Sequence, residues 1–448
     1  MLVFERMQRC LPAALLAVTL AWSGLVRAGR EPVAVPPPAP APAAGAPPVA
    51  APPAAGAPPV AAPPAAPVEE DSLSIYVMTF GPGDHPFFKF GHDALLVRDR
   101  KTGQDRVYNF GTFRFDAPGL IPEFLHGRLT YWLSVSSLAA TIAGYERENR
   151  SIALQELALP PAEKRALRAR LEENARPENR EYKYDYFLDN CSTRVRDAVD
   201  RATGGALREA SRAPGRFTLR EQALRMTADT LPLYLALDLV LGGLTDRPTD
   251  RWAEMYIPQE LERGLRAVML PGPNGPHPLV ASEQTVFAAN RAPPREAPPA
   301  RFVTLLLVGL GIALLFVALG WAAHRPPVRA LLGVLVALWG VVVGFIGCFL
   351  LYAWTLTDHV VAHGNENIFQ CAPWAISLLV LGVGVAFGSR RATLGALRVT
   401  VAGLLLGLVG WGLKAHPAFH QHNAELIALL LPPWFGMSIA LLHARHGS

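Results

Sequence analysis

Long apolar runs fill the last third of the chain. Five of them follow one another from residue 302, at about 302–323, 330–356, 371–388, 396–414 and 424–442. Most are close to the roughly 20 residues that an α-helix needs to cross a bilayer. This pattern predicts an all-α transmembrane domain of five helices over residues 301–448.

The loops between these runs predict how the helices are oriented. The loops at 324–329 and 389–398 are basic, whereas those at 357–370 and 416–425 contain neither lysine nor arginine. Basic loops tend to remain in the cytoplasm. We therefore expect the chain before residue 301 to lie outside the cytoplasm and the C-terminus to lie inside.

Residues 71–300 show a different pattern, in which short β-type runs precede amphipathic ones. Runs rich in apolar, β-branched and aromatic residues predict strands at 74–80, 94–98, 106–110, 129–135 and 151–157. Apolar residues at helical spacing predict helices at 160–176, 191–202, 219–226, 231–241 and 258–269. Strands followed by helices are typical of an α+β domain.

The first 70 residues carry no globular pattern. Residues 1–28 combine Arg6 and Arg9 with an apolar run and a small-residue end, which predicts a signal peptide; an uncleaved anchor is the alternative. Residues 29–70 are dominated by proline and alanine, and the unit AAGAPPVAAPP occurs twice in tandem. This composition predicts a disordered, extended tether.

The overall composition narrows the class of protein. The 448 residues are 51% hydrophobic and 18% charged, which suits a soluble part joined to a membrane part. Four cysteines in so long a chain exclude a disulfide scaffold. The net charge is only +5 and the chain has no dense lysine or arginine block, so we expect no nucleic-acid partner.

Residues 71–300 contain a single cysteine, Cys191, in the stretch YKYDYFLDNCSTRVRD. Asn190 is a good helix N-cap, so Cys191 should lie in the first helical turn, where the dipole and free N–H groups favour a thiolate and can hold an oxyanion. Arg194 and Arg196 add positive charge. The pattern predicts a nucleophile; a small cysteine buried in a core helix is the alternative.

A cysteine nucleophile usually needs a base, and His92 is the best placed histidine. It follows a glycine at the start of a predicted strand in FKFGHDALLVRD. Asn109 in VYNFGTF and Asn190 are candidates to orient the imidazole or to hold an oxyanion. Three phenylalanines just before His92 could line an acyl-chain groove or contact the lipid interface, or simply pack in the core.

The outer loop TDHVVAHGNENI carries Asp358, His359, Asn365 and Asn367. Its His-x3-His spacing, which includes His363, is a weak metal signal, and we expect no metal. A polar loop that orders lipid headgroups or completes the active site is one interpretation. A merely solvated loop is the other.

The stretches FGHDALLVRD, VYNFGTFRFD and YKYDYFLDNCSTRVRD, together with the polar outer loop, resemble the Lnb-type lipoprotein N-acyltransferases. The resemblance covers about residues 72–442. It implies a permuted papain-like thiol fold and a five-helix membrane domain. It also assigns Cys191 as nucleophile and His92 as general base.

The same resemblance implies a reaction and a location. A phospholipid would donate an acyl chain to a diacylated lipoprotein without any cofactor, at the periplasmic face of a bacterial inner membrane. Two other functions fit the residues: a membrane-anchored cell-wall cysteine amidase or endopeptidase, and a membrane scaffold with an inert Cys191.

Overall fold

The computed structural model describes residues 72–114 and 119–446 of the chain. The described residues belong to one compact unit. The predicted signal peptide (1–28) and tether (29–70) lie outside the described residues.

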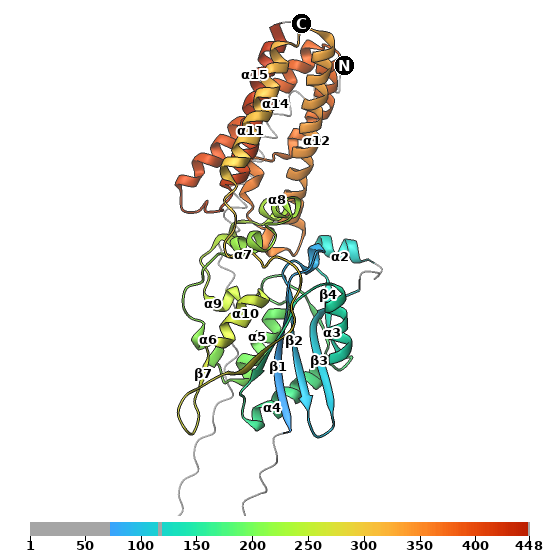
Figure 1. The fold of residues 1–448 in the computed structure, drawn as a ribbon. Coiled ribbons are helices and arrows are strands. Elements are labelled where there is room, and N and C mark those ends of the chain that lie inside the picture. The colour runs from blue at the N-terminus through green and yellow to red at the C-terminus, as the bar shows by residue number, and fades with distance from the viewer. Residues whose placement is uncertain (1–71, 115–118, 447–448) are drawn as a thin grey trace, which may run out of the picture. The chain divides into compact units, whose positions relative to one another are not determined.

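A sheet of seven antiparallel strands forms the scaffold of the N-terminal part, in the spatial order β6-β4-β3-β2-β1-β5-β9 (Figure 1). The strands are β1 (Leu73–Phe80), β2 (His92–Asp99), β3 (Gln104–Thr112), β4 (Thr130–Ser137), β5 (Ile152–Leu157), β6 (Glu181–Lys183) and β9 (Val280–Phe287). The five predicted strands are confirmed as β1 to β5, within a few residues at each end.

The strand β9 was not predicted, because its sequence VASEQTVF is largely polar and exposed and lacks a clear apolar alternation. It follows the helices in sequence but pairs with β5 at the edge of the sheet. Helices at 120–126, 138–147 and 161–174 also lie between strands, so the expected order of strands first and helices afterwards does not hold. The domain is nevertheless rich in sheet with helices packed on it.

The predicted helices are also present. They are α4 (Pro161–Asn174), α5 (Cys191–Ala202), α7 (Leu219–Met226), α8 (Leu231–Val240) and α10 (Pro258–Arg266). The remaining elements of this part are α2 (Leu120–His126), α3 (Leu138–Arg147), α6 (Ala206–Ala210), α9 (Arg251–Glu254) and the small hairpin of β7 (Met269–Leu270) and β8 (His277–Pro278).

Side chains alternate along the strands, so the sheet has two separate apolar faces. On β2, Leu95 and Val97 pack in the core cluster that includes Cys191 of α5 and residues of α4 and α10. Ala94 and Leu96 belong to the opposite cluster, against which α3 packs. This division decides on which face each candidate residue lies.

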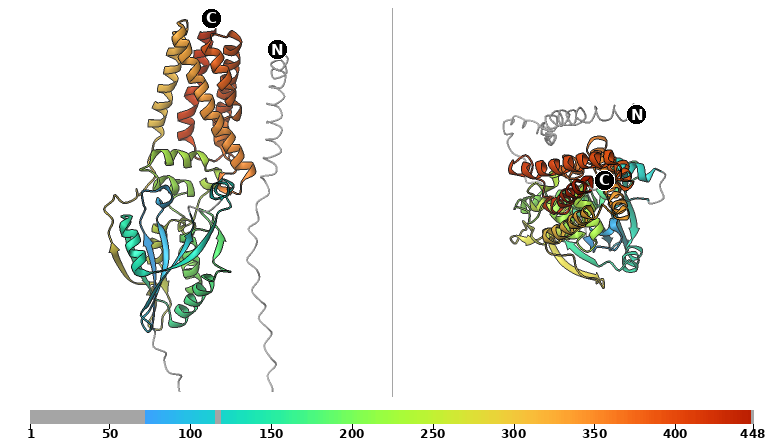
Figure 2. Two further views of the ribbon diagram at one scale, coloured as in Figure 1. Left: turned by 90° about the vertical axis from the view of Figure 1, so that its right-hand side faces the viewer. Right: turned by 90° about the horizontal axis from the view of Figure 1, so that it is seen from above.

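The C-terminal part consists of apolar helices that run side by side (Figure 2). Four helices in the described residues are long and apolar enough to cross a membrane: α11 (Phe302–Trp321), α12 (Pro326–Leu356), α14 (Arg390–Gly412) and α15 (Ala424–His446). The predicted run at 371–388 is not one helix. It contains a 3-10 turn (Pro373–Ser377) and α13 (Leu378–Ala386).

Together with the segment Val360–Phe369, this run forms a pair bent by 59°. Proline disfavours a helical conformation in the residue before it, so a new helix begins at Pro373. The described residues thus contain four candidate spans, or five if the bent pair is counted as one.

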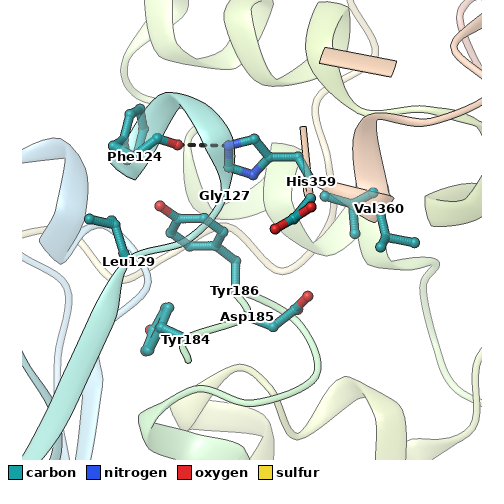
Figure 3. Close-up of a pocket in the computed structure, with 10 residues that line it drawn as sticks. Phe124, Gly127, Leu129, Tyr184, Asp185, Tyr186, His359 and Val360 are labelled. Carbon is teal, nitrogen blue, oxygen red and sulfur yellow. Dashed lines mark hydrogen bonds between the residues drawn. The ribbon is translucent and has the colours of Figure 1, made fainter. Parts of the chain in front are cut away.

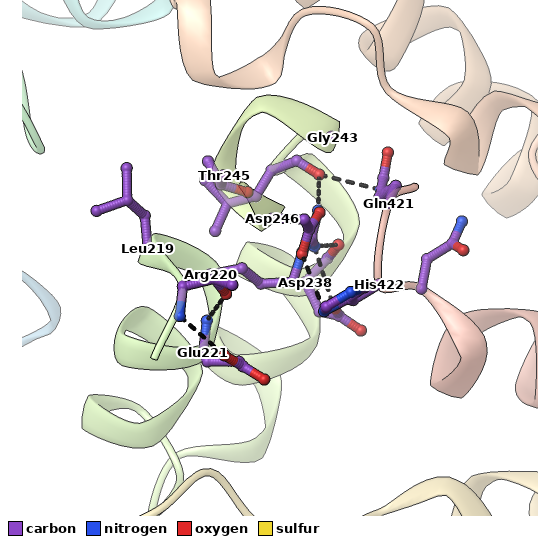
Figure 4. A network of polar contacts seen from close by, with 12 residues as sticks. Leu219, Arg220, Glu221, Asp238, Gly243, Thr245, Asp246, Gln421 and His422 are labelled. Atoms are coloured by element: carbon purple, nitrogen blue, oxygen red, sulfur yellow. Dashed lines mark hydrogen bonds and ion pairs between the residues drawn. The ribbon is translucent and has the colours of Figure 1, made fainter. Parts of the chain in front are cut away.

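A fully paired ionic network connects α7 with the chain after α8 (Figure 4). Arg220 is 1% exposed, and its Nε and Nη1 donate to the carboxylates of Asp246 and Asp238 at 2.8 and 2.9 Å. Its Nη2 donates to the carbonyls of Leu241 and Gly242. Every nitrogen of this guanidinium has an acceptor, which is what makes burial of a charge tolerable.

Candidate active site

The N-terminus of α5 is fixed by a capping box. Asn190 Oδ1 accepts a hydrogen bond from the N–H of Thr193 at 2.9 Å, and the Thr193 hydroxyl accepts one from the N–H of Asn190 at 2.7 Å. The Asn190 amide donates to the carbonyls of Tyr186 and Tyr256, both at 2.9 Å. Because its polar atoms all bond to backbone, Asn190 positions Cys191 but has no free group to hold an oxyanion.

Cys191 is the first residue of α5 and is only 7% exposed. Burial raises the pKa of its thiol to about 12, and the nearby Asp93 carboxyl adds to the effect. The backbone N–H groups of Asp93 and Ser192 lie in hydrogen-bonding reach of the sulfur and, with the charge of Arg150, act to lower the pKa. The expected thiolate is therefore a neutral thiol here, because desolvation outweighs the helix N-terminus.

The arginines that follow Cys191 in sequence are directed elsewhere. Arg194 forms a bidentate pair with Asp189, at 2.6 and 2.7 Å. Arg196 donates to Asp197 at 2.8 Å. The positive charge that acts on the sulfur comes from Arg150 instead.

His92 is the first residue of β2. Its ring stacks with Phe80 and with Tyr145 of α3, at centroid distances of 5.9 and 6.3 Å. Burial and the charge of Arg150 lower the pKa of the imidazole to about 3, although a hydrogen bond with Asn109 acts in the opposite direction. The ring is therefore neutral at physiological pH, as a general base must be.

Asn109 lies beside His92, as its predicted orienting role requires. Its amide donates to the Ser136 hydroxyl at 3.1 Å, which in turn is 2.8 Å from the Thr141 hydroxyl of α3. A chain of polar side chains thus runs from the imidazole to α3. This chain limits the orientations that the Asn109 amide can take.

His92 and Cys191 lie on opposite faces of the sheet, on either side of the backbone at the start of β2. By alternation along β2, His92 points to the α3 face and Asp93 to the face that carries Cys191. Within the described residues, no hydrogen bond joins the sulfur to the imidazole. The direct pair that the sequence suggested is absent because adjacent residues of a strand point to opposite sides.

A break in the strand pairing lets the start of α5 approach the backbone at the start of β2. Pairing of β2 with β3 begins at Leu95 and Tyr108, so the start of β2 pairs with β1 but has no partner on the β3 side. The pairing of β3 with β4 shifts register between Asn109 and Thr112. Gly111, with a positive φ of 84°, lies in this bulge, and a Cβ there would be 3.4 Å from the Cβ of Cys191. The opening between the two strands is where the sulfur reaches the N–H of Asp93.

Asp93 is a buried carboxyl that sequence reasoning missed. It is completely buried, and neither oxygen makes a hydrogen bond within the described residues. Burial raises its pKa to about 7, and the nearby hydroxyls of Ser192 and Thr79 offset this only in part. Its place in the otherwise apolar run of β2, directly after His92, was the signal that could have identified it.

Arg150 is the second residue that sequence reasoning missed. It is 3% exposed and lies over the rings of Phe88 and Tyr145, 5.0 and 4.6 Å from their centroids. Its Nε donates to the carbonyl of Gly81 at 2.9 Å and its Nη1 to Glu148 at 3.2 Å. Its Nη2 is buried and makes no hydrogen bond within the described residues. This N–H is available to an anionic group.

The outer loop docks on α2 through its first two polar residues. Asp358 pairs with Arg128 at 2.8 Å, and its N–H donates to the carbonyl of His126. The ring of His359 bonds to the carbonyl of Phe124 at 2.8 Å. Figure 3 shows the small pocket that they enclose, which is lined by Phe124, Gly127, Leu129, Tyr184, Asp185, Tyr186, Asp358, His359, Val360 and Val361.

Asn365 and Asn367 lie inside the fold, so the alternative of a merely solvated loop is wrong at these two positions. Both are buried, and their amides donate to carbonyls at the C-terminal end of α8: Asn365 to Leu239 and Val240, and Asn367 to Asp238 and Leu239. The last carbonyls of a helix lack partners within the helix, so these side chains cap α8. They neither contact solvent nor line the pocket.

Comparison with known proteins identifies one family. Residues 64–224 match the family described as the Lnb N-terminal periplasmic domain. No curated protein and no solved structure matches the chain. The chain therefore carries an Lnb N-terminal periplasmic domain, followed by apolar helices suited to a membrane, and the resemblance found in the sequence is confirmed for this domain.

Proposed function

We propose that this protein is a lipoprotein N-acyltransferase of the bacterial inner membrane, with its catalytic domain in the periplasm and its C-terminus in the cytoplasm. It would move an acyl chain from a phospholipid to the α-amino group of a diacylglyceryl-cysteine lipoprotein. The catalytic domain would then be a permuted papain-like thiol fold in which Cys191 carries the acyl group.

One observation carries the proposal. Cys191 starts a capped helix at an opening in the sheet, within reach of two backbone N–H groups, and the domain continues into helices long enough to cross a bilayer. A thiol held at a helix N-terminus suits covalent acyl transfer. A membrane-bound domain suits two lipid-anchored substrates better than it suits a soluble cell-wall peptide.

In the first step, His92 removes the proton from Cys191, and the sulfur attacks the carbonyl carbon of a phospholipid ester. The C–S bond forms, and the carbonyl oxygen becomes an oxyanion. The unpaired N–H of Arg150 is suited to stabilise that charge. The ester C–O bond then breaks, and the leaving oxygen takes the proton from His92 to give a lysophospholipid.

In the second step, the free amine of the lipoprotein attacks the thioester carbon. The C–N bond forms, a proton passes from the amine to His92, and the C–S bond breaks. The sulfur regains its proton from His92. The products are an N-acylated lipoprotein and the free enzyme, and neither step consumes ATP or coenzyme A.

This mechanism requires a movement of one side chain. The imidazole of His92 must turn about its Cα–Cβ bond into the opening between β2 and β3 to reach the sulfur. Entry of a substrate would also bring polar groups to the sulfur and lower the cost of charging it.

The test is a transfer assay with the full-length protein in vesicles of phosphatidylethanolamine and phosphatidylglycerol. A synthetic diacylated lipopeptide is added, and its mass is followed. The expected product is the peptide with one further acyl chain on its amine, together with lysophospholipid in equal amount. Cys191→Ala should abolish the product.

The matched control is Cys348→Ala, which removes an exposed cysteine of α12 and should leave the rate unchanged. If the wild type cleaves a muropeptide and leaves the lipopeptide unmodified, the protein is a cell-wall hydrolase instead. If neither substrate changes, the scaffold interpretation replaces both.

A further inference from the structure

Aromatic rings form a series that leads inward from α2. The ring centroids of Phe124 and Phe87 are 6.2 Å apart, those of Phe87 and Phe113 5.6 Å, and those of Phe113 and Tyr131 4.9 Å. Tyr131 in turn stacks on Tyr184 at 4.0 Å. The residues come from separate parts of the chain, so the series is a product of the fold.

The inner end of the series lies beside the candidate nucleophile. The ring of Tyr184 and the Cβ of Cys191 both border Gly111, at 3.5 and 3.4 Å from the position that a Cβ would take there. Gly111 has no side chain, so nothing from this residue separates the ring from the cysteine. The aromatic series therefore ends at Cys191.

The outer end of the series is apolar and exposed. Phe87 is 41% exposed and Phe124 is 38% exposed. On α2, Ile121 and Leu125 are 71% and 39% exposed. Four large apolar side chains close together on one surface are unfavourable in water and mark a surface that meets a partner or a membrane.

The position of α2 identifies that partner as the bilayer. The carbonyl of His126, at the end of α2, accepts a hydrogen bond from the N–H of Asp358 at 2.8 Å. The centroid of the His126 ring lies 6.0 Å from that of the Tyr352 ring. Tyr352 belongs to the last two turns of α12, one of the candidate spans. The end of α2 therefore lies beside the end of a candidate membrane helix, which places its exposed apolar side chains close to where a bilayer would begin.

Two buried hydroxyls beside the inner end of the series, those of Tyr182 and Tyr186, have no hydrogen-bond partner within the described residues. The centroid of the Tyr186 ring lies 5.5 Å from that of the Tyr184 ring. A phenol is a good donor to an ester carbonyl. An acyl ester lying along the rings would place its apolar chain against aromatic carbon and could accept this hydrogen bond.

We propose that α2 lies in the outer leaflet and that the rings of Phe124, Phe87, Phe113, Tyr131 and Tyr184 form the route by which a lipid acyl chain reaches Cys191. This inference rests on the proposed function for its direction of travel. It adds the substrate route, the residues that line it and the element that meets the lipid.

Photo-crosslinking tests the route without any need for catalysis. Full-length protein carrying Cys191→Ala, with p-benzoylphenylalanine in place of Ile121 or of Phe113, is reconstituted in the same phospholipid vesicles and irradiated. Mass spectrometry should find phospholipid adducts at both positions. The same probe in place of Met269, which is 54% exposed on β7, is the matched control and should give none.

Absence of an adduct at position 121 would overturn the contact of α2 with the leaflet. An adduct at 121 without one at 113 would overturn the route. Because the experiment uses an inactive variant, adducts can form even if the wild type transfers no acyl chain. Conversely, transfer by the wild type without adducts would reject the route and leave the proposed function standing.

A second measurement uses the width of the route. In Phe113→Trp the larger ring should raise the ratio of dodecanoyl to hexadecanoyl transfer by roughly ten-fold or more, since a few methylene groups in an apolar site decide such preferences. Met269→Trp should leave the ratio as in the wild type. An unchanged ratio in Phe113→Trp, measured at normal total rate, would contradict the route.

Discussion

Two buried polar clusters in this protein differ in how completely their groups are paired. Around Arg220, each nitrogen of the guanidinium donates to a carboxylate or a carbonyl. Around Cys191, both oxygens of Asp93 and one nitrogen of Arg150 are buried without hydrogen-bond partners in the part of the chain that the structure describes.

We interpret this difference as one between a structural cluster and the proposed functional one. A buried polar group left unpaired costs about 1–3 kcal/mol, so a fold retains it only where something else requires it. The Arg220 cluster needs no further ligand. Under the proposed function, a substrate that brings an ester, an oxyanion or an amine to these groups would complete the Cys191 cluster.

Removal of the proposed general base, His92, should have the largest effect on the rate of acyl transfer. His92→Ala should lower the rate of acyl transfer by about 10²–10⁴-fold, the range that general acid–base catalysis contributes. His277→Ala, which removes a histidine of β8, should have no effect. Transfer by His92→Ala within a factor of about three of the wild-type rate would show that another group takes the proton.

The structural cluster should respond to mutation in stability instead. Arg220→Gln leaves Asp238 and Asp246 buried without their cation and should lower the free energy of unfolding by about 3–5 kcal/mol. Arg212→Gln, at an exposed ion pair, is the control. Urea unfolding in detergent measures both, and the folded fraction of Arg220→Gln should keep its specific activity. Equal stability of the two variants would contradict this assignment.

The carboxyl of Asp93 should make stability depend on pH. Its pKa is about 7 in the folded protein, against an ordinary value of 3.8 for the same group in the unfolded chain. Between these values the folded chain holds a proton that the unfolded chain has lost, so stability falls as pH rises through this window. The loss approaches roughly 4 kcal/mol above pH 7.

The matched variant is Asp93→Asn, which cannot titrate. The difference in unfolding free energy between wild type and Asp93→Asn should shift between pH 4 and pH 7 in favour of the variant. Taking the difference cancels the contribution of His92 to the pH dependence of stability. Its lowered pKa makes stability rise with pH, opposite to the effect of Asp93. A difference that is constant with pH would mean that Asp93 is ionised throughout.

The smallest of these effects should come from the orienting residue. Asn109→Ala removes the hydrogen bond to His92 and should lower kcat by about ten-fold, which corresponds to roughly 1.4 kcal/mol, with KM unchanged. Asn174→Ala, on the exposed side of α4, is the control. A change in KM alone would indicate that Asn109 contacts the substrate.

Local patterns in the sequence predict the parts of this fold that local patterns determine. The strands β1 to β5 and the helices α5 and α7 follow from apolar runs and caps, and the cap at Asn190 places Cys191 at the start of its helix as expected. The polar strand β9 and the bend before Pro373 depend on tertiary pairing and packing, which no local pattern records.

The same limit applies to the candidate site. Cys191, His92 and Asn109 stand out as residue types in suitable places. Arg150 reaches the site only because β5 pairs with β1, and the raised pKa of Cys191 depends on how deeply the helix start is buried. Asn365 and Asn367 look like a solvent-facing loop in sequence, yet they cap a helix more than one hundred residues away.

The most direct test of the account is to search for the acyl-enzyme. The full-length protein is incubated with phospholipid vesicles in the absence of any lipopeptide, digested and analysed by mass spectrometry. The account predicts one acyl chain on the peptide that contains Cys191, removable by neutral hydroxylamine, and its loss with N-acylation when the lipopeptide is added. An unmodified Cys191 peptide in a preparation that transfers acyl chains would contradict it.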